Sequence, residues 1–211
     1  MFNFYDNIKQ NPRLNPNYDS HKIKLPFRAL IACSSGNGKS NLVMNLLVEM
    51  TNTFTKIIIC TKEEEPLYDF MKSKLKDKME IFYHGEIPEL KKMPKDENGI
   101  VIFDDLVLDK KPEIGQMYIR GRKLGYSSIY ISQSFYHTDS IIRKNCNLVW
   151  LGRGMMSRDL RLILSEFSLG LSKEELTALY NQLTATKMNF MLLDMEDRTI
   201  RQNIKDIVME F

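Results

Sequence analysis

A glycine-rich segment that follows an apolar run and opens a helical stretch places the strongest constraint on the fold of this chain. The segment is CSSGNGKS, residues 33–40; PFRALIAC leads into it and SNLVMNLLVEM continues from it. Glycines between a strand and a helix let backbone amides converge on phosphate oxygens, and the helix N-terminus adds unpaired N–H groups and a partial positive charge. The segment therefore predicts a phosphate-binding loop at the end of a strand.

The residue types in this loop predict how a nucleotide would bind. Lys39 is expected to reach the β- and γ-phosphates, and the Ser40 hydroxyl is expected to ligate Mg²⁺. Cys33 stands where the consensus has its first glycine, and we interpret it as a small buried hydrophobic residue and not as a redox switch. The expected nucleotide-binding residues are Ser35, Gly36, Asn37, Gly38, Lys39, Ser40 and Asn41.

Short apolar runs alternate with amphipathic stretches along the rest of the chain. Such alternation is typical of a parallel sheet covered on both faces, because the crossover helices lie over each face. We therefore predict an α/β fold with a mostly parallel central sheet. The expected strands are residues 26–33, 56–60, 80–84, 99–103, 127–132, 147–152 and 188–195; the expected helices are residues 40–50, 65–79, 113–124, 138–145, 157–167 and one opened by the capping-box spacing of Ser172 and Glu175.

The length of 211 residues corresponds to one domain with appended segments. We expect an N-terminal arm, residues 1–26, and a P-loop domain, residues 27–211. The arm contains three prolines and several asparagines, which favour turns and extended backbone over a helix, and it is either a disordered terminus or a segment that docks on a neighbour. Within the domain, the core motifs occupy residues 27–153 and further helices and a strand occupy residues 154–211.

Composition and cysteine content exclude several classes of protein. Hydrophobic residues at 43% and charged residues at 27% exclude disordered, collagen-like and disulfide-rich chains. The three cysteines are widely spaced and contain no CxxC pair, which indicates a reducing compartment and no structural zinc. The apolar runs are strand-sized and no cationic segment precedes one at the N-terminus. We therefore expect an intracellular protein with no membrane span, no signal peptide and no metal beyond Mg²⁺.

A second acidic motif follows about sixty residues after the loop, where the apolar run 100–103 leads directly into Asp104 and Asp105. A carboxylate at the end of a buried strand beside a phosphate loop is the Walker B arrangement, in which Asp104 would hold Mg²⁺, largely through water. An adjacent acid can orient and polarise an attacking water, which is the role expected for Asp105. The alternative is that both aspartates cap a helix at a strand-to-loop corner.

The next expected strand ends in Gln133. If this strand lies between the strands of the two preceding motifs, its carboxyl end faces the γ-phosphate. A neutral amide there can donate to phosphate while accepting a hydrogen bond from water. We therefore interpret Gln133 as a candidate sensor of the γ-phosphate, the alternative being an ordinary polar residue at a strand end.

Three motifs in this order, CSSGNGKS, IVIFDD and IYISQSFY, resemble the FtsK–HerA superfamily of ring ATPases. The stretch RGRKLGYSSIYISQSFYHTDSIIRKNCN is most similar to the poxvirus-type genome-packaging ATPases of large DNA viruses and virophages. The resemblance covers residues 27–153. It implies a RecA-like (ASCE) P-loop ATPase that binds ATP and Mg²⁺, assembles into a homo-oligomeric ring, a hexamer or a pentamer, and drives double-stranded DNA into a preformed capsid.

Carried over by position, the resemblance assigns phosphate and Mg²⁺ contacts to Lys39 and Ser40, the metal to Asp104, the catalytic carboxylate to Asp105 and the sensor to Gln133. It also implies capsid proteins as partners and a location inside the host cell, in the cytoplasm or a virus factory, with association with the virion.

The formal net charge is only +3, so any nucleic-acid contact must be local. Residues 107–165 contain ten Lys or Arg and four acids, which leaves the remainder of the chain acidic. In ring ATPases an arginine of one subunit can complete the γ-phosphate site of the next, since a planar guanidinium matches the charge of the transition state. The first candidates are Arg120 and Arg122, and the second are Arg143 and Arg153; a solvent-exposed helix position is the alternative for each.

Two other functions remain open. The arginines of GRGMMSRDLR are compatible with the phosphate-gripping lid of a nucleoside or nucleotide kinase, although Asp105 and Gln133 argue against this. An ATP-binding assembly factor, in which the nucleotide only controls oligomerisation, is the second alternative. A GTPase is disfavoured because the chain has no NKxD motif for reading guanine.

Overall fold

The computed structural model describes residues 13–95, 98–106 and 111–211. Residues 1–12 of the expected arm, and Asp109 and Lys110 of the basic stretch, lie outside the described residues. The described chain forms a mixed α/β structure around one sheet of nine strands, in the order β3-β2-β4-β5-β1-β6-β7-β8-β9. The prediction of an α/β fold with a mostly parallel sheet is therefore confirmed.

The first six strands form the parallel part of the sheet. Apolar side chains dominate these strands because both faces of the sheet are covered, and β4 and β5 are buried along their whole length. β5 lies between β1 and β4, as the interpretation of Gln133 requires. The strands are β1 (Arg28–Ala32), β2 (Lys56–Thr61), β3 (Met79–Phe82), β4 (Gly99–Asp104), β5 (Tyr126–Ser132) and β6 (Leu148–Leu151).

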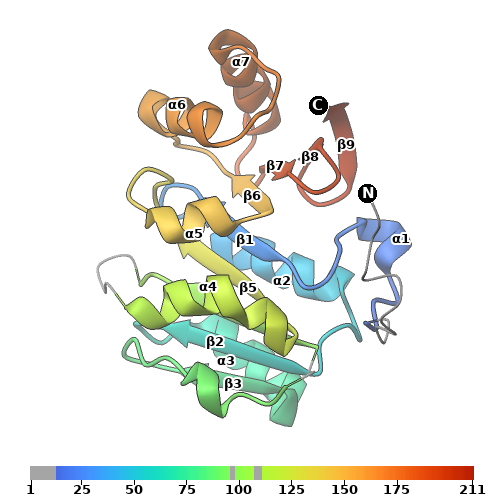
Figure 1. Ribbon diagram of the computed structural model, residues 1–211, viewed down its shortest axis with the longest axis vertical. Coiled ribbons are helices and arrows are strands. Elements are labelled where there is room, and N and C mark those ends of the chain that lie inside the picture. The colour runs from blue at the N-terminus through green and yellow to red at the C-terminus, as the bar shows by residue number, and fades with distance from the viewer. Residues whose placement is uncertain (1–12, 96–97, 107–110) are drawn as a thin grey trace, which may run out of the picture.

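The helices cover the two faces of the sheet and form two hydrophobic cores (Figure 1). Within β1, Leu30 and Ala32 pack into the core under α4 and α5, whereas Ala29 and Ile31 pack into the core under α2 and α3. This alternation follows from the two-residue period of a strand. The helices are α2 (Lys39–Glu49), α3 (Pro66–Leu75), α4 (Pro112–Leu124) and α5 (Ser140–Asn145), with single 3₁₀ turns at Lys76–Lys78 and Leu90–Lys92.

The C-terminal part adds two helices and an antiparallel extension of the sheet. The expected capping box is present, since the Glu175 amide donates to Ser172 Oγ and the Ser172 amide to Glu175 Oε2. The hairpin of β8 and β9 was not predicted, because polar residues interrupt its apolar pattern and Arg201 is buried within β8. The elements are α6 (Ser157–Glu166), α7 (Lys173–Leu183), β7 (Met191–Asp194), β8 (Thr199–Gln202) and β9 (Asp206–Glu210).

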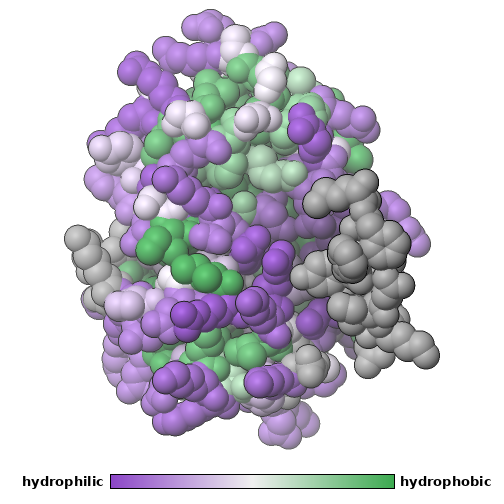
Figure 2. Space-filling model, in the orientation of Figure 1, coloured by the Kyte–Doolittle hydropathy of each residue, from purple (hydrophilic) through white to green (hydrophobic). Residues whose placement is uncertain are grey.

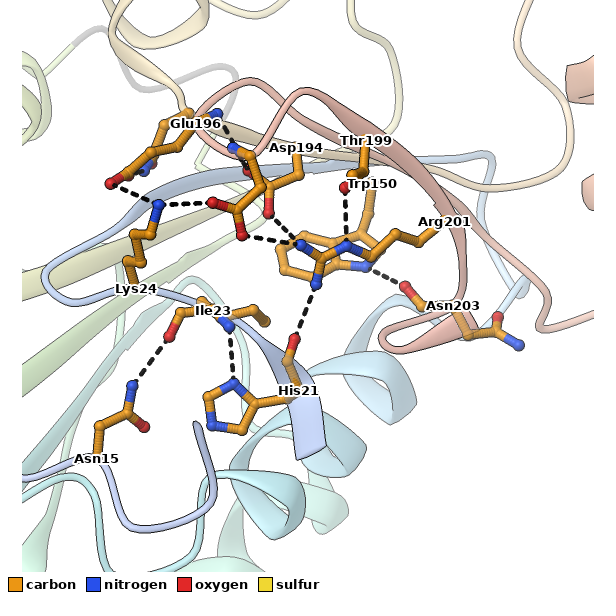
Figure 3. Close-up of polar contacts among 12 residues, drawn as sticks. Asn15, His21, Ile23, Lys24, Trp150, Asp194, Glu196, Thr199, Arg201 and Asn203 are labelled. Atoms are coloured by element: carbon orange, nitrogen blue, oxygen red, sulfur yellow. Dashed lines mark hydrogen bonds and ion pairs between the residues drawn. The ribbon is translucent and has the colours of Figure 1, made fainter. Parts of the chain in front are cut away.

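The described part of the arm, residues 13–26, lies against the domain and contains one short helix, α1 (Tyr18–His21), where only turns and extended backbone were expected. His21 and Ile23 are fully buried. Figure 3 shows the contact with the C-terminal hairpin: Arg201 Nη1 donates to the His21 carbonyl, and Lys24 reaches the turn after β7. The two ends of the described chain therefore pack together at the side of the sheet.

Most of the surface in Figure 2 is hydrophilic, with an apolar area near its centre. A groove of about 440 Å³ lies between α4 and α5 and is lined in part by Ile119 and Ile141, which are 52% and 45% exposed. In the part of the chain that the structure describes, no helix is long and apolar enough to cross a membrane.

Candidate nucleotide-binding site

The glycine-rich loop lies between β1 and α2, at the carboxyl edge of the parallel strands. Gly36 and Gly38 have φ angles of 72° and 92°, a left-handed conformation that glycine adopts without steric cost. Gly38 is the N-cap of α2, and Lys39 is its first residue. Ser35, Gly36 and Asn41 are exposed around this helix start. The loop therefore has the backbone conformation that the sequence predicts for a phosphate site.

Side chains and the segment after β6 fix the shape of the loop. Asn37 Nδ2 donates to Ser34 Oγ at 2.7 Å, and Ser34 donates from its amide and its hydroxyl to the Arg153 carbonyl at 3.2 and 3.1 Å. A Cβ atom on Gly154 would lie 2.4 Å from Ser34 Oγ, so this close approach needs glycine. These hydrogen bonds hold the loop in shape, and Asn37 contributes to that shape.

Lys39 lies along the loop, with its Nζ 3.1 Å from the Cys33 carbonyl and 3.5 Å from the Ser34 carbonyl. Cys33 is fully buried, and burial raises the pKa of its thiol to about 11. A thiol with so high a pKa is almost entirely protonated at neutral pH and is a poor nucleophile. The interpretation of Cys33 as a small buried hydrophobic residue is confirmed.

Asp104 ends β4 beside the loop, and α3 supplies its partner. Tyr68 Oη donates to Asp104 Oδ2 at 2.5 Å, and the Tyr68 side chain is fully buried. Burial raises the pKa of Asp104 to about 6, although the hydrogen bond from Tyr68 opposes this shift. Burial and the Asp104 charge both raise the pKa of Tyr68. The carboxylate is therefore held in one orientation.

Ser40 is linked to the same helix, because Ser40 Oγ donates to Glu65 Oε2 at 3.2 Å. Tyr68 interacts with Asp104, Glu65 and Ser40, so a hydroxyl and two carboxylates lie around its phenol. Among the described residues, no group of three or more His, Cys, Asp or Glu side chains forms a metal site. Oxygen donors that are few in number suit Mg²⁺, which keeps several of its waters, so Ser40 and Asp104 fit the ion that the sequence implies.

Asp105 and Gln133, two of the predicted catalytic residues, lie at the same edge of the sheet. Asp105 follows β4 directly, and its side chain is exposed. Its φ angle is 54°, a left-handed conformation that aspartate tolerates better than most residues. Gln133 follows β5 directly and is also exposed. Because β5 separates β1 from β4, Gln133 follows the strand between the one that leads to the phosphate loop and the one that leads to Asp104.

The candidate arginines lie in different places. Arg120 and Arg122 are exposed on α4. Burial lowers the pKa of Arg28, which begins β1, and the nearby Arg122 charge lowers it further. Arg122 therefore lies at the opposite end of the sheet from the phosphate loop of its own chain. Arg153 is exposed beside that loop.

Arg143 is committed to a structural role, which corrects its place among the candidates. It forms a salt bridge of 2.7 Å with Glu166, and both side chains are 10% exposed. It also donates to the Thr138 carbonyl and lies over the Phe135 ring. A guanidinium so fully engaged is not available to a neighbouring subunit.

Sequence reasoning missed Glu65, Tyr68 and Met188. Glu65 is the N-cap residue of α3, in an acidic run before Pro66 that by itself indicates only the start of a helix. The missed signal is that β2 is parallel to β4, with Thr61 opposite Asp104, so the residues after β2 reach the same edge as Asp104. Met188 comes from the distant loop before β7 and lies against Gly38, a contact with no local signal.

Comparison with known proteins gives one family and several similar structures. The family model described as "Poxvirus A32 protein" matches residues 17–208. No curated protein sequence matches this chain. The genome-packaging NTPase B204 of Sulfolobus turreted icosahedral virus 2, in complex with AMPPCP, has a TM-score of 0.63 and 18% identity, covering 88% of this chain and all of that one.

Two further structures are similar. The DNA-packaging ATPase B204 of Sulfolobus turreted icosahedral virus has a TM-score of 0.61 and 16% identity, covering 92% of this chain and all of that one. The cytoplasmic domain of the type VII secretion ATPase EccC of Thermomonospora curvata has a TM-score of 0.55 and 12% identity, covering 86% of this chain and 25% of that one. At these identities the likeness concerns the fold.

Proposed function

The chain belongs to the poxvirus A32 protein family, and from this premise we propose that it is an ATPase that assembles into a ring and uses ATP hydrolysis to drive double-stranded DNA into a viral capsid. The similar viral structures are described as packaging enzymes, and one was determined with an ATP analogue. We further propose a RecA-like core in residues 27–211, preceded by the arm of residues 1–26.

The observation that carries this proposal is the position of β5 between β1 and β4. It brings the phosphate loop, the paired aspartates and Gln133 to one edge of the sheet, where ligands bind in open α/β folds. A simple phosphate-binding turn would need neither the second aspartate nor the amide. An enzyme that hydrolyses a nucleoside triphosphate would use both.

Each side chain has a proposed task. Residues 35–41 would surround the phosphates, with Lys39 on the β- and γ-phosphates. Ser40 and Asp104 would hold Mg²⁺, which supplies charge neutralisation on the phosphates when bound. Asp105 would orient the attacking water, and Gln133 would contact the γ-phosphate and that water.

Ring assembly would bring one subunit's arginine to the next subunit's nucleotide. Arg120 and Arg122 suit this role because they are exposed and lie away from the site of their own chain. The ring would be a hexamer or a pentamer. With Arg143 engaged in its salt bridge, Arg153 is the remaining alternative.

Exposed cations of the basic stretch would contact DNA through its phosphates. Besides DNA and further copies of the chain, the proposed partners are capsid proteins. The proposed location is the host cytoplasm or virus factory, with association with the virion.

The segment that resembled a kinase lid is held firmly. Asp159 is 2% exposed and accepts hydrogen bonds from the Ser134 hydroxyl, the Tyr136 amide and the Met156 amide. Arg158 lies 2.9 Å from His137 Nε2 and over the Tyr136 ring. A lid must move to admit substrate, so these contacts favour the motor over a nucleoside kinase.

The decisive experiment measures ATPase rate and particle mass, each with and without double-stranded DNA. A motor should assemble and hydrolyse ATP faster on DNA, whereas a kinase or an assembly factor should not respond to DNA.

Asp105→Asn should lower turnover about 10²-fold to 10⁴-fold while nucleotide binding remains. If DNA changes neither rate nor mass, the motor is the wrong function. Intact assembly and hydrolysis after charge reversal of Arg120 and Arg122 would exclude them as trans arginines.

A further inference from the structure

We propose that α3 is part of the catalytic site, with Glu65 as a second carboxylate that would hold hydrated Mg²⁺ together with Asp104, and Tyr68 as the residue that positions Asp104. This inference rests on the proposed function, since it concerns the ion that accompanies ATP. It assigns roles to two residues that the Walker motifs do not include. Both lie in the first turn of one helix, as the N-cap and the third helical residue.

The bond from Ser40 to Glu65 prepares the Ser40 hydroxyl for a cation. A serine hydroxyl has one hydrogen and two lone pairs, and the hydrogen is directed to Glu65 Oε2 at 3.2 Å. A lone pair of Ser40 Oγ can then bind a metal ion beside the contact of Ser40 with the Tyr68 hydroxyl, and the carboxylate makes the oxygen a better donor. Partners that orient a ligand in this way usually tune metal affinity strongly.

A helix-capping role does not explain where the Glu65 carboxylate lies. As the N-cap of α3, Glu65 accepts hydrogen bonds through its backbone carbonyl, from the amides of Tyr68 at 2.9 Å and Asp69 at 3.2 Å. Its side chain makes no capping hydrogen bond. The carboxylate instead points across to α2 and Ser40. A helix cap needs none of this, whereas the water shell of Mg²⁺ offers donors to such a carboxylate.

Tyr68 has a complementary task. Its side chain is fully buried, and its hydroxyl is committed to Asp104 Oδ2 at 2.5 Å. One oxygen of the carboxylate is thus fixed by the protein, which leaves Oδ1 to accept from a metal-bound water. Because Tyr68 acts through Asp104, it is a positioning residue and does not itself touch the reacting atoms.

The neighbouring glutamate provides a matched control. Glu64 is exposed and precedes Glu65 in the same acidic run. It lies near Tyr83, whose pKa is raised by burial, then by Asp69 and last by the Glu64 charge. Glu64→Gln therefore removes the same charge one residue away, without removing the contact to Ser40.

The experiment is calorimetric titration of the full-length chain with ADP, with and without Mg²⁺, together with a melting temperature for each variant. For Glu65→Gln we expect the affinity for ADP alone to stay within about twofold, while the gain in affinity from Mg²⁺ falls about 10-fold to 100-fold. Tyr68→Phe should show a smaller loss of the same kind. Glu64→Gln should behave as the unmodified chain.

Two outcomes would overturn the inference, and they can be told apart. If the unmodified chain binds ADP more tightly with Mg²⁺ and Glu65→Gln keeps that gain in full, the role of Glu65 is wrong and the proposed function stands. If the unmodified chain binds no nucleotide, the proposed function fails as well. A Tyr68→Phe variant that keeps its melting temperature and its full Mg²⁺ response would exclude the positioning role of Tyr68 alone.

Discussion

The guanidinium of Arg201 lies 2.7 Å from the carboxylate of Asp194, and the two side chains are only 1% and 3% exposed. The same guanidinium donates to Thr199 Oγ1 at 3.0 Å and to the His21 carbonyl at 2.8 Å (Figure 3). One buried cation thus joins the C-terminal hairpin to the N-terminal arm. The charge can be buried because the N–H groups of the guanidinium have hydrogen-bond partners and a carboxylate neutralises it.

Arg201→Met should lower the free energy of unfolding by about 3 to 5 kcal/mol, because Asp194 would be left as an unpaired buried charge. Urea denaturation measures this loss. Lys24→Met is the control, since Lys24 and Asp197 form a partly exposed pair, 45% and 24% exposed, whose loss should cost less than about 1 kcal/mol. Equal losses of unfolding free energy in the two variants would show that burial does not increase the contribution of the Arg201–Asp194 pair to stability.

Stability should fall as the pH drops below about 6.5, in part because of His21. Burial lowers the pKa of His21; the charges of Arg201, Lys205 and Lys22 lower it further, and Glu49 opposes them. The Nδ1 atom accepts the Ile23 amide at 2.9 Å, which requires the unprotonated ring nitrogen. Between its folded and unfolded pKa values, the unfolded chain holds more protons, so acid favours unfolding.

The test compares the unmodified chain with His21→Gln by urea denaturation at several pH values. The variant should be less stable at pH 7.5, and the difference between the two proteins should narrow toward pH 5.5. A difference that stays constant across this range would show that His21 does not contribute to the pH dependence.

The sequence predicted the parallel part of the fold because each signal there is local. A strand buried on both faces shows an unbroken apolar run, such as residues 100–103, and the glycine-rich loop marks the start of α2. The hairpin of β8 and β9 was not predicted, because the burial of Arg201 in β8 depends on partners that are distant in the sequence. Arg201 can be buried in β8 because Asp194 neutralises its charge and the His21 carbonyl accepts a hydrogen bond from it.

The candidate site likewise contains residues that local motifs predicted and residues that they did not. Motif spacing predicted the residues at the ends of β1, β4 and β5, since parallel strands bring their carboxyl ends to one edge. Glu65 and Tyr68 belong to no motif, and they reach the site because α3 begins at that edge after β2. The role proposed for Arg120 and Arg122 would depend on a neighbouring subunit, which no pattern in one chain describes.

Gly38→Ala should weaken ADP binding more than Gly36→Ala. Both glycines have positive φ angles, so each substitution carries a backbone cost of about 1 to 2 kcal/mol. A Cβ at Gly38 would also lie 2.9 Å from Met188 Cγ, whereas one at Gly36 meets nothing within 4 Å. Calorimetric titration with ADP checks this order, and a stronger effect at Gly36 would contradict it.

Asp159→Asn should slow ATP hydrolysis at least about tenfold while leaving ADP affinity nearly unchanged. The Asp159 carboxylate binds Ser134 Oγ at 2.9 Å and the Tyr136 amide at 2.8 Å, and so fixes the segment directly after Gln133. A small displacement of Gln133, the proposed sensor of the γ-phosphate, should be costly for rate. The free energy of unfolding should also fall by about 2 kcal/mol, because a neutral amide accepts these buried hydrogen bonds more weakly than a carboxylate does.

The control for Asp159 is Asp139→Asn. Asp139 caps α5 by accepting the Ile141 amide at 2.8 Å, so its loss should cost about 1 kcal/mol of stability through the helix end. Because the Asp139 side chain acts on the start of α5, turnover should stay close to that of the unmodified chain. Steady-state ATPase assays on both variants, at a temperature where each is fully folded, separate the two effects. Equal turnover in the two variants would mean that Asp159 supports the fold and does not position Gln133.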